Sequence, residues 1–325
     1  MLAVILLVAL RLTIGWHFFY EGVWKVANAD EFSALPFLNM AKGPFAPIFY
    51  SMTPDLEGRI RMQVKDGKVA CDAYRTPWAA QKALVEKKYA LSEEQKENID
   101  AIYDQYVSSL DTFLTSKAGD VQAYFVSLDL LKKDKSNGND GPEQKKRQWE
   151  QMMKLRGEMN GWLKAIEGLG ADMTTDFESV LTTEQKSKSG TLPEIIPTTD
   201  RMPLGITFPF ASWTSFLNFT ITWALTAIGF CLITGFCARL AAIGGGLFLC
   251  SVCMTQPAWP LIWPHDAPIL GHAMIVDKNF VEMVAIFTLA TMPVGRWAGL
   301  DYFVWNWFGK PVLKLFGFTQ WTEEA

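Results

Sequence analysis

The sequence predicts an all-α membrane protein: a four-transmembrane-helix bundle with a mainly helical extracytoplasmic insertion between the first and second spans. Long apolar stretches lie at the start of the chain and again after residue 206. Residues 28–205 between them hold 23 of the 30 Lys and Arg and 27 of the 34 Asp and Glu, whereas residues 206–256 hold one charge, Arg239. The expected parts are a first transmembrane helix (1–27), the insertion (28–205), three further spans (206–299) and an interfacial tail on the cytoplasmic side (300–325).

The first span is expected over residues 2–24, which is long enough to cross a bilayer at 1.5 Å per residue. Residues 27–29, Ala-Asn-Ala, resemble a signal-peptidase site, but no basic segment precedes the apolar run, so we expect the helix to be retained. Residues 33–52 are apolar but contain three prolines and a glycine, which predicts an interfacial loop or a short re-entrant piece.

The insertion is expected to begin with a small β-hairpin over residues 59–71, turning at Asp66-Gly67. Residues 76–131 then have helical periodicity, with a capping box at Ser92 and Gln95 and an interruption at Gly119. A polar loop, 135–142, leads to a second long helix, which we expect to end near Gly168 and Gly170. This pattern predicts an antiparallel helical hairpin or small bundle, followed by a linker over residues 186–205.

The remaining spans are expected over residues 213–235, 240–256 and 280–295, with an interfacial loop at 257–276. The aromatic tail after residue 300 is expected to lie along the membrane surface. Basic residues near short loops mark the cytoplasmic ends, and they place the insertion outside: Arg239, Arg296, Lys310 and Lys314.

A polar stripe runs along the first span, formed by Arg11, His17, Glu21 and Lys25. Ionisable groups at membrane depth are costly, so the stripe should face protein or a wet cavity. One interpretation is a proton path or a quinone head-group site, with Glu21 and His17 handling protons, Lys25 as their charge partner and Arg11 as a buried anchor. The alternative is a structural ion pair.

Four further side chains are expected at the same outer level, as candidate cofactor-binding residues: Cys250, Cys253, Glu282 and His272. The two cysteines form a C-x-x-C, which is either ordinary helix packing or a dithiol that exchanges electrons with a quinone. His265, His272 and Glu282 match no metal motif, so no metal site is predicted, and a His17–His272 haem pair has equally little support. Cys71, in the hairpin, is expected to be buried.

Several function classes are disfavoured by the sequence. The insertion is near neutral and carries no basic patch, so no nucleic-acid partner is expected. The chain contains no Gly-rich phosphate loop, nucleophile elbow or nicotinamide or flavin fingerprint. Any redox cofactor would therefore be a membrane quinone or would belong to another subunit.

Short motifs in the membrane segments resemble the DoxX family of four-helix membrane proteins, which includes the DoxD subunit of thiosulfate:quinone oxidoreductase. In the first span they are Arg11-Leu12, Gly15, Phe19, Gly22 and Lys25. The sequence TGFCARLAA at 234–242 resembles the family's turn between spans two and three, and Lys278-Asn279-Phe280 resembles the start of its last span. The long insertion departs from the compact family pattern.

The resemblance implies a subunit of a quinone- or thiol-linked redox system in the bacterial inner membrane. The insertion would then face the periplasm and dock a periplasmic or membrane protein that delivers electrons or a sulfur substrate. A non-enzymatic anchor that presents the helical insertion to a partner is the alternative. A small-solute exporter, which would need an oligomer to form a pore, is a third interpretation.

Overall fold

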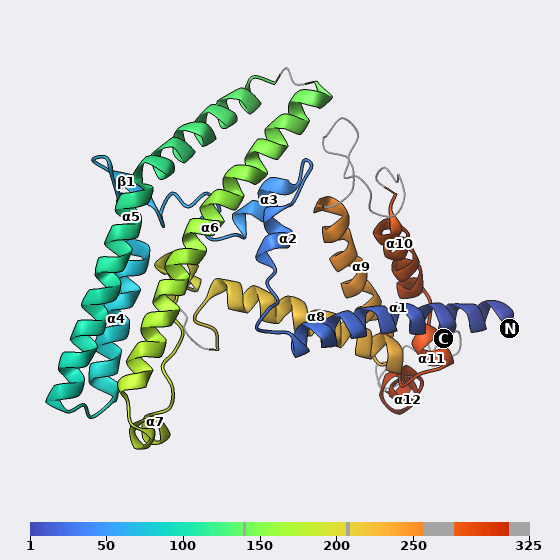
Figure 1. Cartoon of the computed structure of the whole chain (residues 1–325). Helices are drawn as coiled ribbons and strands as arrows, with labels where there is room; N and C mark the ends of the chain where they lie inside the picture. Colours follow the sequence, from blue (N-terminus) through green and yellow to red (C-terminus); the bar gives the residue numbers. More distant parts are fainter. Residues whose placement is uncertain (139–140, 206–208, 256–275, 312–325) are drawn as a thin grey trace. The chain divides into compact units, whose positions relative to one another are not determined.

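The computed structural model describes residues 1–138, 141–205, 209–255 and 276–311, and these are mainly helical (Figure 1). The chain divides into two compact units. The membrane-helix unit is Met1–Met52 together with Thr214–Ala325, and the helical-hairpin unit is Thr53–Trp213.

The helical-hairpin unit begins with two short antiparallel strands, β1 (Gln63–Lys65) and β2 (Lys68–Ala70). Val64 pairs with Val69, and Asp66 and Gly67 both have positive φ at the turn, as the Asp-Gly signal predicted. The helices that follow are α4 (Asp72–Lys88), α5 (Glu93–Ser136), α6 (Pro142–Val180) and α7 (Thr183–Ser189). Two single turns end the unit, η1 (Thr198–Asp200) and η2 (Pro203–Gly205).

Helices α5 and α6 pack side by side as the predicted hairpin (Figure 1). Their apolar faces enclose one core together with α4 and the strands, and its fully buried members include Trp78, Ile99, Leu110, Met159 and Phe177. Ser92 and Gln95 form the expected capping box at the start of α5, and Thr182 and Gln185 form another at the start of α7.

Both long helices continue through glycines at which the sequence suggested breaks. A glycine inside a helix costs only about 1 kcal/mol, which packing along the rest of the helix outweighs. α5 runs through Gly119, and α6 passes Gly168 and Gly170 to end at Val180. A side chain at Gly170 would meet the indole of Trp78, so this glycine lets the buried ring approach α6.

The membrane-helix unit contains three helices long and apolar enough to cross a bilayer: α1 (Leu2–Ala27), α8 (Trp213–Thr234) and α9 (Ala238–Thr255). The fourth predicted span corresponds to α10 (Lys278–Thr291). Its 14 residues extend about 21 Å, short of the roughly 30 Å hydrocarbon layer, so its crossing stays a prediction. After it come α11 (Val294–Trp297), α12 (Asp301–Val304) and η3 (Trp305–Gly309).

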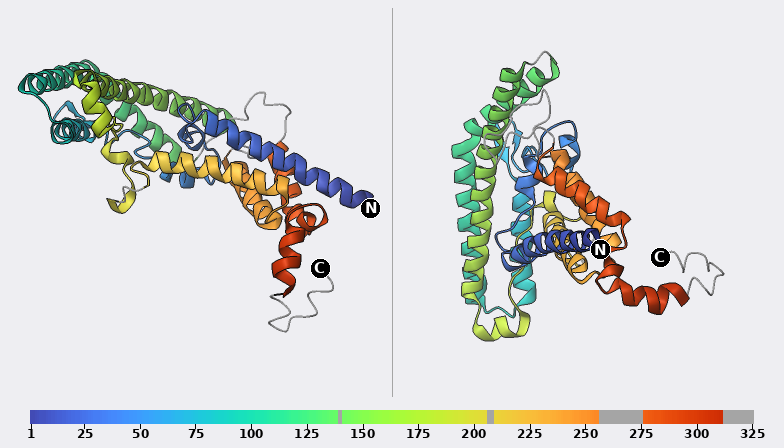
Figure 2. Two further views of the ribbon diagram at one scale, coloured as in Figure 1. Left: turned by 90° about the horizontal axis from the view of Figure 1, so that it is seen from below. Right: turned by 90° about the vertical axis from the view of Figure 1, so that its right-hand side faces the viewer.

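Glycines let the membrane helices approach closely. A Cβ at Gly15, Gly22 or Gly229 would collide with the neighbouring helix, at Leu232, Thr226 and Phe19 respectively. The α1 positions rise as the α8 positions fall, so α1 and α8 run antiparallel, as the left view of Figure 2 shows. On α9, Gly245 and Gly246 face Ile286 and Phe287 of α10 in the same way.

The segment predicted as an interfacial or re-entrant piece forms two short helices, α2 (Leu35–Asn39) and α3 (Ala46–Ser51). It is tied to the long helices by polar contacts. The Lys42 backbone N–H donates to the Thr255 carbonyl at the end of α9, at 3.0 Å, and the Ala34 N–H donates to the Asn218 side chain of α8, at 2.9 Å. This segment therefore belongs to the membrane-helix unit.

Candidate functional site

His17 and Glu282 lie against each other across two helices that are far apart in sequence. His17 Nδ1 is 2.8 Å from Glu282 Oε1, so the first turns of α10 meet the middle of α1. The His17 side chain is 56% exposed and the Glu282 side chain 18%. The carboxylate engages the ring through Nδ1, so Nε2 is the ring nitrogen that remains for a ligand.

Glu21 and Lys25 form a second pair, one turn apart on α1. Lys25 Nζ donates to Glu21 Oε2 at 2.8 Å. The Lys25 ammonium also lies 5.4 Å from the centre of the Phe32 ring, and its side chain is only 15% exposed. Lys25 is thus the charge partner of Glu21, as the i, i+4 spacing predicted.

Arg11 lies apart from both pairs and is 2% exposed. Its Nη1 donates to the Val294 carbonyl at 2.8 Å and its Nη2 to the Ala298 carbonyl at 2.7 Å. These carbonyls belong to α11 and to the residue after it, so the guanidinium joins α1 to the chain that follows α10. Arg11 is thus buried and bonded to backbone carbonyls, as expected of a buried anchor.

The polar stripe of α1 therefore does not share one environment, because Arg11 is buried whereas His17 and Glu21 are exposed. The buried residues of this helix include Arg11, Gly15, Phe18 and Gly22, which face the other helices. His17 and Glu21 lie on the exposed side of that strip, where each has one ionic partner. The prediction that the whole stripe faces the protein interior is therefore wrong for these two side chains, because only the Arg11 position of the stripe falls on the packed face of α1.

The two α9 cysteines are present as free thiols, with Cys253 buried and Cys250 partly buried. His265 and His272 lie outside the described residues. Among the residues that the structure does describe, no three or more His, Cys, Asp or Glu side chains gather at one point.

A feature that sequence reasoning missed is the junction between the α8–α9 turn and the chain after α10. Asp301 accepts from the backbone N–H groups of Cys237 at 2.7 Å and Ala238 at 2.9 Å, which caps the start of α9. The Leu300 and Asp301 N–H groups donate to the carbonyls of Thr234 and Gly235. Such a cap supplied 63 residues further along the chain has no local sequence signal.

Beside this junction lies a hollow of about 210 Å³. Its lining includes two arginines, one carboxylate and one indole ring, with apolar side chains at its edge: Arg239, Arg296, Asp301, Trp305, Leu240 and Val304. It adjoins the C-terminal end of α10, whereas Glu282 lies near the N-terminal end of the same helix.

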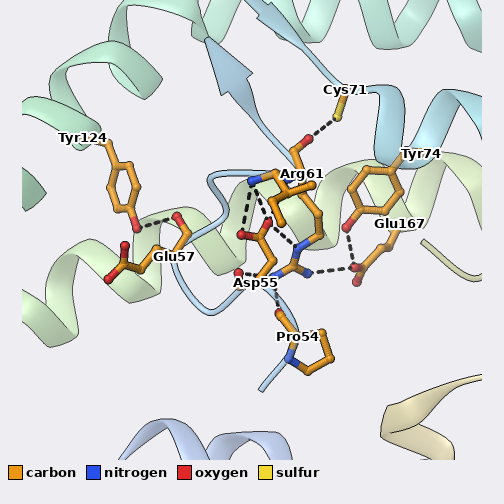
Figure 3. Close-up of polar contacts among 9 residues, drawn as sticks. Pro54, Asp55, Glu57, Arg61, Cys71, Tyr74, Tyr124 and Glu167 are labelled. Atoms are coloured by element: carbon orange, nitrogen blue, oxygen red, sulfur yellow. Dashed lines mark hydrogen bonds and ion pairs between the residues drawn. The ribbon is translucent and has the colours of Figure 1, made fainter. Parts of the chain in front are cut away.

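A second polar cluster occupies the helical-hairpin unit (Figure 3). The Asp55 carboxylate accepts from the backbone N–H groups of Ile60 and Arg61, and the Arg61 guanidinium lies between Asp55 and Glu167, at 3.5 and 3.9 Å. Tyr74 donates to Glu167 at 2.7 Å. These bonds fix the loop before the strands against α4 and α6.

Cys71 belongs to the same cluster and is fully buried, as predicted. Its Sγ donates to the Arg61 carbonyl at 2.9 Å. Burial raises the pKa of the Cys71 thiol to about 12, so the nucleophilic thiolate is scarce at neutral pH. Burial also raises the pKa of Tyr124, to about 12, and its hydroxyl donates to the Glu57 carbonyl. The cluster is thus a structural one.

Comparison with known proteins finds no matching family model, no matching curated protein and no matching solved structure. The likeness to the DoxX family therefore rests on the short motifs in the sequence alone.

Proposed function

We propose that this chain is a DoxX-like membrane subunit of a quinone- or thiol-linked redox system, in which His17 and Glu282 handle protons at the surface of the helix bundle. In this proposal α10 is the fourth span of the bundle. The membrane is the bacterial inner membrane, and the Thr53–Trp213 unit faces the periplasm, where it docks the partner that supplies electrons.

The observation that supports it most is the His17–Glu282 pair. Two ionisable side chains on different apolar helices are costly to hold at membrane depth without a role or a partner, and here each is the other's partner. Unlike Arg11, the imidazole stays more than half exposed. A ligand arriving through the lipid could therefore reach the imidazole.

The chemistry required of these residues is modest. A membrane quinone takes up two electrons and two protons when it is reduced. His17 would hold the ligand oxygen by a hydrogen bond at Nε2, and Glu282 would orient the ring through Nδ1 and accept or return its proton. The electrons would come from the partner or from a dithiol. Cys250 and Cys253 are candidates for the dithiol because their spacing puts both on one side of α9.

Quinone binding tests this proposal. The full chain in lipid nanodiscs is titrated with a short-chain ubiquinone, and binding is followed by quenching of tryptophan fluorescence, with Trp16 next to His17 as a reporter. We expect saturable binding that His17→Ala and Glu282→Gln each weaken at least about tenfold, because a lost charged hydrogen bond costs roughly 1.5–3 kcal/mol. Thr288→Val on exposed α10 surface is the matched control. Equal quenching in all four proteins would refute a site at this pair.

A second candidate function is a non-enzymatic anchor that presents the α5–α6 hairpin to another protein. The specific observation in its favour is that the buried polar cluster of that unit is built from internal bonds, which involve Cys71, Tyr74 and Arg61. Absence of quinone binding, together with a stable partner recovered with the full chain but lost when α5 surface residues are changed, would favour this function.

A further inference from the structure

We propose that the hollow beside the α8–α9 turn binds the phosphate group of an anionic phospholipid. The proposal is independent of quinone chemistry, because the hollow and the His17–Glu282 pair adjoin opposite ends of α10.

The hollow carries a net positive charge. Arg239 and Arg296 line it together, and their positive charges are near enough to repel each other. The one carboxylate in the lining, Asp301, has both oxygens engaged by the N–H groups of Cys237 and Ala238. The hollow is therefore net positive, and a bound anion would relieve the repulsion between the arginines.

The hollow also contains hydrogen-bond donors. Arg239, which lines it, donates from its Nε to the Met292 carbonyl, at 3.4 Å. The Arg296 guanidinium stacks on the Trp305 ring, 3.7 Å from its centre, which holds it in place. The Trp305 indole Nε1 is buried and has no hydrogen-bond partner among the described residues. Two guanidinium groups and an indole N–H suit the several acceptor oxygens of a phosphate.

The surroundings of the hollow favour a lipid over a free phosphate as its ligand. The hollow lies at the turn between the last residues of α8 and the first residues of α9. Both helices are long enough to span a bilayer, so the hollow lies at one end of each. Its edge and the helices beside it expose large apolar side chains, among them Leu240 at 70%, Trp307 at 70% and Phe308 at 65%. Such surface is costly in water but suits acyl chains, and basic pockets at the ends of membrane helices bind anionic head groups.

The test measures lipid binding to the purified full chain by native mass spectrometry. Detergent-solubilised protein is titrated with phosphatidylglycerol, or with phosphatidylcholine of the same acyl chains, and a parallel thermal-shift series uses inorganic phosphate. We expect one phosphatidylglycerol bound at least about tenfold more tightly than phosphatidylcholine, with no shift from inorganic phosphate at matched ionic strength. Equal affinity for the two lipids would overturn the proposal, and a shift by inorganic phosphate alone would make the ligand a free anion instead.

Variants locate the site. Arg239→Gln with Arg296→Gln should abolish the preference for phosphatidylglycerol, whereas Lys87→Gln with Lys88→Gln on α4 removes the same charge elsewhere and should keep it. Should the arginine double variant fail to fold, Trp305→Phe keeps the ring under Arg296 but removes the N–H donor, and it should weaken binding several-fold. Full preference retained in Trp305→Phe and in any folded arginine variant would contradict the assignment to this hollow.

Discussion

Arg11 shows how one side chain can organise the membrane-helix unit. It is 2% exposed and satisfies two carbonyls on the chain after α10, which otherwise would lack donors at that depth. A Cβ at Gly235 in the α8–α9 turn would also meet this guanidinium. The sequence marked Arg11 as a buried anchor, but its acceptors are backbone atoms almost 290 residues away, and no side-chain pattern identifies such partners.

Arg11→Ala should therefore lower the free energy of unfolding of the full chain in detergent by about 3–5 kcal/mol, since it leaves one buried and one part-buried carbonyl without their donor. Thermal unfolding followed by circular dichroism measures it. Thr13→Ala on the exposed side of α1 is the matched control and should stay within about 0.5 kcal/mol of the wild type. A similar small loss in both variants would contradict the anchoring role of Arg11.

The buried thiol of Cys71 should make the stability of the helical-hairpin unit depend on pH. Burial raises its pKa from the ordinary 9.0 to about 12, so the unfolded chain loses this proton first as pH rises. The stabilising contribution of the buried thiol is complete below about pH 9 and is lost between pH 9 and 12. The urea midpoint of the full chain should fall across that window, and the fall should be smaller in Cys71→Ala. Equal slopes in the two proteins would show that the thiol does not titrate this way.

At the scale of elements, local signals predicted the helix starts and the hairpin turn well. Ser92 with Gln95 and Asp66 with Gly67 act through their immediate neighbours, so a short stretch of sequence contains all the information. Helix ends assigned to Gly119 and Gly168 were wrong because a glycine is only a weak breaker and long-range packing decides whether a helix continues.

The glycines of the two units should respond to substitution in opposite ways. Gly229→Ala should destabilise the full chain by about 1–3 kcal/mol, because its Cβ would meet the Phe19 backbone of α1. Gly119→Ala meets nothing within 4 Å in the middle of α5 and should stabilise by about 0.5–1 kcal/mol. Gly244→Ala, with ordinary contacts to Ile228, is the control within the membrane helices. Tolerance of Gly229→Ala would disprove the close α1–α8 contact.

For the whole molecule, the distribution of charge along the sequence separated apolar helices from a charged segment at 28–205. The structure also has two units, but residues 28–52 belong to the membrane-helix unit and the helical-hairpin unit is Thr53–Trp213. Among the described residues three helices are long and apolar enough to span a bilayer, and α10 is shorter than the fourth predicted span. The sequence placed Glu282 at the level of His17, and the two are in contact. His17 pairs with Glu282 and not with Glu21, which lies one turn away on the same helix. This choice depends on how α10 packs against α1, and the sequence pattern of a single helix does not reveal it.

The central claim is that the His17–Glu282 pair handles protons in a membrane redox reaction. Its most direct test is the rate of quinone reduction in membranes that contain the full chain and its native partners, with thiosulfate and a dithiol as alternative electron donors. Glu282→Gln and His17→Gln should each lower this rate by about a hundredfold or more, while Thr13→Ala leaves it unchanged. Wild-type rates in both variants, with the proteins present at normal levels, would contradict the account.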